Sequence, residues 1–285
     1  MKLTDDTVEG KPRLNVDDIR REVSLTRSKY LIVEGNVDRR FFTEWVRTIG
    51  VRWMPSYSEP HIICIGDIDV PDGVLIQEGV TLGNRSRILC LSNELNDFAN
   101  KLRCVVDVDC GEHRDDFSSP VLMWTDFPAL ESYAFNPQVL DTLNRNMLSE
   151  RLPEGEILIS LLREALRDLY VVRHQNPSLA RPLVSKGVIK RGGDYAGFDV
   201  RKTVPPNVAV KVGEYESPEY SDVREVVYGH DLAALLMAVF GNLIKNQCGL
   251  RDEEALENGL RMAILVEGSF ARMPLFSGLA DWMGG

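Results

Sequence analysis

The sequence predicts an α/β protein, in which a mostly parallel sheet is flanked by helices and followed by a mainly helical C-terminal region. Several apolar runs of strand length show no alternation with polar residues, so both of their faces are expected to be covered. Helical patterns separate these runs at the spacing of βαβ units, which is typical of a parallel sheet. Beyond residue 136 the short apolar runs give way to longer helical patterns.

The first βα unit can be located from its apolar pattern and its flanking residues. Residues 16–23 are expected to form a short helix, with Asn15 as its cap. Residues 30–33 form an apolar, β-branched run that predicts the first buried strand. From 36 to 49 the apolar residues recur at helical spacing, and Gly50 is expected to end that helix.

Three further apolar runs predict the remaining strands of the sheet. They cover residues 61–65, 102–106 and 121–124, and each is expected to be buried. A helix is expected over residues 84–100. The acidic, glycine-containing segment 66–83 lacks periodicity, so it is predicted to be a loop with one short element.

Longer helical patterns dominate the C-terminal half. They cover residues 139–174, with an interruption at 153–155, and then 231–245 and 253–267. Residues 185–211 are rich in glycine, proline and basic residues and are predicted to form a basic loop. The expected domains are a lead-in with a short helix at 1–27, an α/β domain at 28–136 and the mainly helical region at 137–285.

Composition limits the classes of protein to consider. Hydrophobic residues make up 44% and charged residues 27%, as in ordinary globular proteins. No apolar run is long enough to cross a bilayer, and the polar N-terminus lacks the apolar core of a signal peptide. An odd number of cysteines favours reduced thiols and a cytoplasmic location. The net charge of −10 argues against a nucleic-acid coat and against an anionic membrane partner.

Carboxylates follow two of the predicted strands. Glu34 comes directly after the first strand, and Asp107 and Asp109 come after the third. Ligands of parallel sheets bind at the carboxyl ends of the strands, and residues two apart in an extended chain point the same way. Carboxylates that share a site repel each other, and Mg²⁺ or Mn²⁺ would relieve this. We expect a catalytic metal site here, although each acid alone could be a helix cap or a solvated loop residue.

Two sets of motifs carry a resemblance to a known family. Val33-Glu34-Gly35 with Asp38, and Asp107-Val-Asp109, resemble the Toprim domain of topoisomerases, bacterial primases and OLD nucleases. The stretch WTDFPALESY, at residues 124–133, resembles the "T-D-(Y/F)-x-x-(I/L)-E-x-Y" element of a Toprim family from bacterial anti-phage systems. GHDL, at residues 229–232, is similar to the C-terminal part of that family, which includes the Toprim effector of the PARIS defence system.

The resemblance covers most of residues 28–245 and implies a Rossmann-type fold and a metal-dependent nuclease. It implies that Glu34 acts in acid–base chemistry or metal binding, and that the Asp-x-Asp pair binds Mg²⁺. Asp38 resembles the second acid of the OLD branch. Glu131 is expected to complete the metal site, and Asp126 and His230 are further candidates within the motifs. The family implies a toxic effector that is released by a partner ATPase of the ABC or OLD-like type.

A nuclease also needs positive charge for phosphate, and the acidic chain offers few sources. Relatives often carry a lysine in the turn that corresponds to residues 66–83, and here it is absent. The basic loop and the helix after Glu34 are expected to contact the nucleic-acid backbone, although a solvated loop is the competing interpretation. The candidate residues are Lys186, Lys190, Arg191, Arg39 and Arg40, with Lys245 as a further one.

Alternatives to a nuclease remain open at this point. A non-catalytic Toprim-fold binding or assembly module would fit the net charge of −10 and the missing lysine. Apolar residues within 273–282 could be core packing, or a docking face for the ATPase or a second copy of the chain. A primase or topoisomerase fragment is a weaker interpretation, because no zinc-binding domain or nucleophilic-tyrosine domain is evident. The residues do not distinguish DNA from RNA, including tRNA, as the substrate.

Overall fold

The computed structural model describes residues 13–52, 59–110, 114–177, 179, 181–212 and 220–284. It is a mixed α/β structure with parallel sheets flanked by helices, and about 58% of it is helical. The chain divides into two compact units. The sheet unit comprises residues 1–107, 113–125 and 271–285, and the helical unit comprises residues 108–112 and 126–270.

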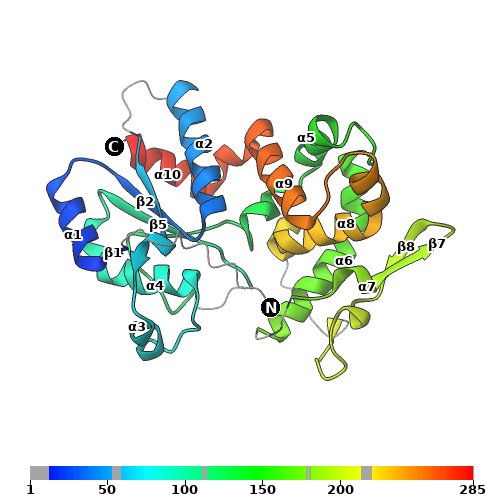
Figure 1. Ribbon diagram of the computed structural model, residues 1–285, viewed down its shortest axis with the longest axis horizontal. Helices are drawn as coiled ribbons and strands as arrows, with labels where there is room; N and C mark the ends of the chain where they lie inside the picture. Colours follow the sequence, from blue (N-terminus) through cyan, green and yellow to red (C-terminus); the bar gives the residue numbers. More distant parts are fainter. Residues whose placement is uncertain are drawn as a thin grey trace. The chain divides into compact units, whose positions relative to one another are not determined.

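Four parallel strands form the main sheet, in the order β3-β2-β5-β6. Its central strands β2 and β5 are labelled in Figure 1. The central strands are β2 (Tyr30–Val33) and β5 (Leu102–Val106), and the predicted parallel arrangement is confirmed. The outer strands are β3 (His61–Cys64) and β6 (Leu122–Trp124). Complete burial was expected for all four strands, but the outer strands are partly exposed because each has only one neighbour in this sheet.

The predicted helices of the sheet unit are present, with shifted ends. Helix α1 (Val16–Leu25) begins after Asn15, whose side chain accepts a hydrogen bond from the backbone N–H of Asp18 as predicted. Helix α2 (Asn36–Arg52) continues past Gly50, so the predicted stop is wrong. A glycine weakens a helix by only about 1 kcal/mol, which need not end it.

The acidic segment after β3 contains more structure than one short element. Strand β4 (Ile68–Asp69) pairs in parallel with β1 (Leu14–Asn15), and helix α3 spans Asp72–Gln77. Helix α4 (Asn84–Glu94) ends earlier than expected. The chain tightens there into a 3₁₀ turn at Asn96–Phe98, so the single helix predicted over 84–100 is wrong at its C-terminal end.

The C-terminal helix α10 (Pro274–Gly284) belongs to the sheet unit, although it follows the helical unit in the chain. Phe276 is fully buried, and its ring centroid lies 5.9 Å from that of Phe42 and 5.1 Å from that of Trp45, both on α2. Leu275, Leu279 and Trp282 are also buried. These apolar side chains therefore pack in the core, and the alternative that they form a docking face is wrong.

The helical unit contains the helices predicted for it, which are α5 (Pro137–Met147), α6 (Gly155–Gln175), α8 (Gly229–Asn246) and α9 (Glu253–Glu267). A short helix that was not predicted, α7 (Val184–Gly187), lies at the start of the expected basic loop. The expected basic loop instead contains an antiparallel hairpin of β7 (Val188–Arg191) and β8 (Asp194–Phe198). Gly192 and Gly193 make its turn with φ of 61° and 100°, values that hairpin turns require and glycine adopts readily.

None of the described helices combines the length and the apolar composition that crossing a membrane requires. All five cysteines are free thiols. Cys104 lies on β5 and is fully buried, and this burial raises the pKa of its thiol to about 12. A thiol that stays protonated is a poor nucleophile, so Cys104 acts as a small apolar residue.

Candidate functional site

Two carboxylate residues lie side by side at the carboxyl ends of the central strands. Glu34 follows β2 and Asp107 follows β5, and both are half-buried. The backbone N–H of Asp107 donates a hydrogen bond to Glu34 Oε1 over 2.9 Å. Glu34 is therefore held at the end of the neighbouring strand, at the edge where parallel sheets bind their ligands.

The first turn of α4 joins the ends of three strands of the sheet. Asn84 Nδ2 donates to the carbonyl oxygen of Glu34 over 3.0 Å. Arg85 Nε donates to the carbonyl oxygen of Asp107 over 3.1 Å, and its guanidinium lies 5.4 Å from the ring centre of Trp124, at the end of β6. This arrangement places a cation beside the strand-end carboxylates.

Arg85 is a candidate that the sequence analysis missed. The phosphate-binding lysine of the family was expected within residues 66–83, and Arg85 lies two residues beyond that segment, at the start of a helix. A basic residue at a helix start is unfavourable for the helix dipole. This unfavourable position was the signal in the sequence that Arg85 has a role other than stabilising the helix.

Asp38 lies in the first turn of α2. Its Oδ2 accepts a hydrogen bond from the backbone N–H of Gly35 over 2.9 Å, so it stabilises the start of α2. A side chain at Gly35 would crowd the same oxygen, at 3.3 Å. Asp38 therefore helps to cap the start of α2. Its role in metal binding stays a prediction.

Asp109 does not continue the extended chain of β5. The strand ends at Val106, and Asp109 has a left-handed φ of 52°. Its N–H donates to the carbonyl oxygen of Pro128 over 2.9 Å within the helical unit, whereas Asp107 ends the sheet unit. The expectation that Asp107 and Asp109 point the same way from an extended chain is therefore wrong, and metal binding by Asp109 stays a prediction.

In the helical unit, three ionisable side chains from distant parts of the chain meet. Glu131 lies in a 3₁₀ turn, His230 on α8 and Glu257 on α9. One possible ligand atom from each lies within 4.8 Å of the other two, and this spacing could hold a metal ion. Glu131 and His230 were predicted from the family motifs, but Glu257 was not.

Two arginines already balance the charge of this group. Arg261 forms an ion pair with the buried Glu131, and Arg181 lies 3.3 Å from Glu257 Oε1. His230 Nδ1 is 2.9 Å from the same Glu257 oxygen. Arg181 is shared with Glu253, at 3.0 Å, so three carboxylates lie near two guanidiniums and His230. Because these cations already face the carboxylates, we interpret the group as an ion-pair network.

The network also shifts the proton affinities of its members. Burial by itself lowers the pKa of His230, but the hydrogen bond to Glu257 and the charge of Glu131 leave that pKa raised. Burial opposes ionisation of Glu257, yet the hydrogen bond and charge of His230 hold the pKa of Glu257 below its usual value. Both shifts favour a charged His230–Glu257 pair.

The two motif segments of the helical unit lie against each other. Ser132 Oγ donates to the carbonyl oxygen of Val227 over 2.6 Å, which joins the 124–133 element to the chain before α8. Tyr133 donates its hydroxyl to Asp126 Oδ2 over 2.7 Å and accepts from the backbone N–H of Asp126. Asp126 therefore orients this turn, and its predicted functional role stays a prediction.

Gly229, at the start of α8, allows the two segments to approach. A Cβ atom added there would lie 2.5 Å from Glu131 Cβ and 2.9 Å from the backbone nitrogen of Ser132. We expect Gly229→Ala to lower the free energy of unfolding, because backbone atoms would have to move. On the same helix, a Cβ at Gly241 would meet nothing within 4 Å, so Gly241→Ala is the matched control and should stabilise by about 0.5–1 kcal/mol. Equal effects of the two substitutions in urea denaturation would contradict this account.

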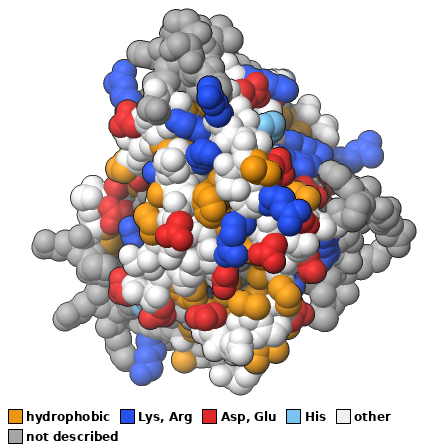
Figure 2. All heavy atoms as spheres, turned by 90° about the vertical axis from the view of Figure 1, so that its left-hand side faces the viewer, with side chains coloured by type: hydrophobic (Ala, Val, Ile, Leu, Met, Phe, Trp, Pro, Cys, Tyr) orange, Lys and Arg blue, Asp and Glu red, His pale blue; other side chains and the backbone are white. Residues whose placement is uncertain are grey.

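The predicted basic residues differ in their surroundings. Lys190 Nζ donates to the carbonyl oxygen of Val239 over 3.1 Å, next to a kink of α8 at Phe240. Lys190 therefore supports the hairpin, although it is exposed, as Lys186, Arg191 and Lys245 also are. Figure 2 shows the left-hand side of Figure 1, away from the drawn hairpin, and on that face basic and acidic side chains are interspersed. The nucleic-acid role of these residues stays a prediction.

No protein-family model matches the chain, and the search of curated proteins gives no match. The Toprim resemblance therefore rests on the motifs alone.

Proposed function

We propose that the chain is a Mg²⁺- or Mn²⁺-dependent nuclease whose site lies at the ends of β2 and β5. The observation that carries the proposal is the pair Glu34 and Asp107, held together at the ends of neighbouring parallel strands and beside Arg85. This position is the usual ligand site of a parallel sheet. The Toprim resemblance of Glu34 and Asp107 adds support from the sequence.

The donor atoms of this pair suit a hard divalent cation. Carboxylate oxygens are the ligands that Mg²⁺ prefers, and each oxygen has two lone pairs. The hydrogen bond that Glu34 Oε1 accepts from Asp107 therefore leaves it able to bind an ion. Glu34 and Asp107 would hold the ion, which when bound supplies positive charge to the phosphate oxygens. Asp38, Asp109 and Glu131 remain predicted ligands from the sequence.

The side chains around the pair have distinct roles in the proposed reaction. Arg85 has a planar guanidinium that can bind phosphate oxygens through two hydrogen bonds, and Trp124 and the Asp107 carbonyl fix its position. Glu34 either binds the metal ion or accepts the proton of the attacking water. Asn84 keeps the end of β2 in place through its bond to the Glu34 carbonyl.

The biological role that we propose is the toxic effector of a bacterial anti-phage defence system. The resemblance of residues 124–133 and 229–232 to that family supports this role. The contact between these two segments within the helical unit is consistent with their acting together. In this proposal a partner ATPase of the ABC or OLD-like type restrains the nuclease and releases it on infection. The substrate is DNA or RNA, with tRNA among the candidates.

The experiment that tests the proposed activity compares metals and substrates. The full chain is incubated with plasmid DNA, single-stranded DNA and total tRNA, each with Mg²⁺, with Mn²⁺ and with EDTA. We expect cleavage of at least one substrate with either metal and none with EDTA. Intact substrates under every condition would overturn the nuclease proposal.

A non-catalytic binding or assembly module of a defence complex is the second candidate. Met262 and Val266, one turn apart on α9, are 51% and 60% exposed, so they form a small apolar face on that helix. Such a face suits contact with a protein partner, and the net charge of −10 disfavours broad contact with nucleic acid. Failure of the chain to bind Mg²⁺ or Mn²⁺ at millimolar concentration would favour this second function.

A further inference from the structure

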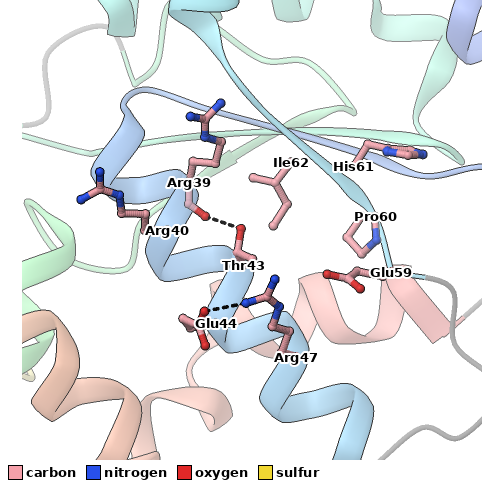
Figure 3. Close-up of a pocket in the computed structure, with 9 residues that line it drawn as sticks. All are labelled: Arg39, Arg40, Thr43, Glu44, Arg47, Glu59, Pro60, His61 and Ile62. Carbon is pink, nitrogen blue, oxygen red and sulfur yellow. Dashed lines mark hydrogen bonds and ion pairs between the residues drawn. The ribbon is translucent and has the colours of Figure 1, made fainter. Parts of the chain in front are cut away.

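The sheet unit has a cavity between α2 and the start of β3, with a volume of about 680 Å³ (Figure 3). Arg39, Thr43 and Arg47 lie along one side, on successive turns of one face of α2. Pro60 and Ile62 form the opposite side, at the exposed edge strand. The cavity therefore has a polar, basic wall facing an apolar one.

The charges around the cavity favour an anion locally in an acidic chain. Arg39, Arg40 and Arg47 face two carboxylates, Glu44 and Glu59, so the lining has one positive charge in excess. Arg47 pairs with Glu44 at 2.8 Å, and Arg39 pairs with Asp67 at 3.1 Å, outside the lining.

Neither ion pair would prevent the arginines from binding a phosphate. The four side chains in these pairs are between 39% and 61% exposed. Exposed ion pairs contribute about 0–1 kcal/mol, whereas arginine and phosphate form charge-assisted, two-pronged hydrogen bonds. Arg40 is exposed and has no ion pair among the described residues, so a phosphate near it would displace no partner.

The dimensions and the apolar wall point to a nucleic-acid strand. Arg39 and Arg47 are eight residues apart, which is roughly 12 Å along a helix and long enough to contact separate phosphates. The half-buried Ile62, beside the buried Pro60, offers an apolar surface for a base. Glu44 and Glu59 can accept hydrogen bonds from base amino groups. A base that is stacked and paired in a duplex has no free face to pack against Ile62, so a single strand is the expected ligand.

We propose that this cavity binds single-stranded nucleic acid, with backbone phosphates at Arg39 and Arg47 and a base against Pro60 and Ile62. The inference rests on the proposed nuclease function, because it names the form of the substrate. Glu34 follows β2, and α2 begins two residues later, so the connection that carries the proposed site leads directly into the cavity wall. In this proposal, the nucleic-acid strand that is cut beside Glu34 continues along α2.

The test measures binding without cleavage. Fluorescence anisotropy of short labelled DNA and RNA single strands is recorded in EDTA at several salt concentrations, with Glu34→Ala as the inactive background. Adding Arg39→Glu and Arg47→Glu should weaken binding by at least about tenfold. Loss of two phosphate contacts should also reduce the slope of log affinity against log salt by about 1.4.

The matched control adds Arg145→Glu and Arg163→Glu, which make the same charge change at exposed positions on α5 and α6. This variant should bind almost as tightly as the background. Equal losses in both variants, unchanged binding in the cavity variant, or tighter binding of the same sequence as a duplex would each overturn the inference. If the cavity variant unfolds in circular dichroism, Arg39→Gln with Arg47→Gln replaces it. Because EDTA excludes cleavage, this result is independent of whether the nuclease proposal holds.

Discussion

Replacing Glu34 with glutamine is expected to lower metal-dependent cleavage by at least about 100-fold while leaving the fold intact. The glutamine amide oxygen can still accept the hydrogen bond from the Asp107 N–H, so the ends of β2 and β5 stay together. The substitution removes the negative charge and the basicity of the side chain. Cleavage rates measured with the substrate identified in the metal comparison give the size of the loss.

A matched control and a second measurement make this result specific. Glu78→Gln removes the same charge at an exposed position at the end of α3 and should leave cleavage unchanged. Titration with Mn²⁺ then separates the two roles of Glu34. Weakened metal binding in Glu34→Gln would identify a ligand, whereas normal binding without cleavage would identify the proton acceptor. Full cleavage by Glu34→Gln would sink the assignment of the site.

Local pattern predicted the sheet well because buried parallel strands are continuous apolar runs. Strands β2 and β5 begin and end at the predicted residues, since both of their faces are covered. The β7–β8 hairpin was missed because most of β7 is exposed, so burial imposes no apolar run on it. The packing of α10 against α2 was also missed. Its apolar pattern shows that one face of the helix is buried, but it does not show which element covers that face.

Those parts of the candidate site that depend only on the order of the strands could be predicted from the sequence. The approach of Glu34 and Asp107 follows from neighbouring parallel strands that end at one edge. The departure of Asp109 could not be foreseen, because a single left-handed residue ends the extended chain. Glu257 and Arg261 are four residues apart on α9 and look like an ordinary exposed pair, and only tertiary packing brings them to His230 and Glu131.

The largest effect on stability is expected at Asp231, in the first turn of α8. Its side chain is fully buried and accepts two hydrogen bonds from Arg173, from Nε over 2.7 Å and from Nη2 over 2.8 Å. The guanidinium also lies 4.4 Å from the ring centre of Tyr228. We expect Asp231→Ala to lower the free energy of unfolding by about 3–5 kcal/mol, because it leaves the charge of Arg173 buried without its partner.

A double-mutant cycle tests whether the Asp231–Arg173 ion pair is buried or exposed to solvent. Asp231→Leu combined with Arg173→Met removes both charges and should be more stable than either single variant, because no buried charge remains. Glu164→Ala removes one member of an exposed ion pair with Arg167 on α6 and should cost at most about 1 kcal/mol. If urea denaturation gave Asp231→Ala the same small loss as Glu164→Ala, the pair would not be buried in solution. Other interactions would then have to hold the start of α8, which carries His230 and Gly229, in place.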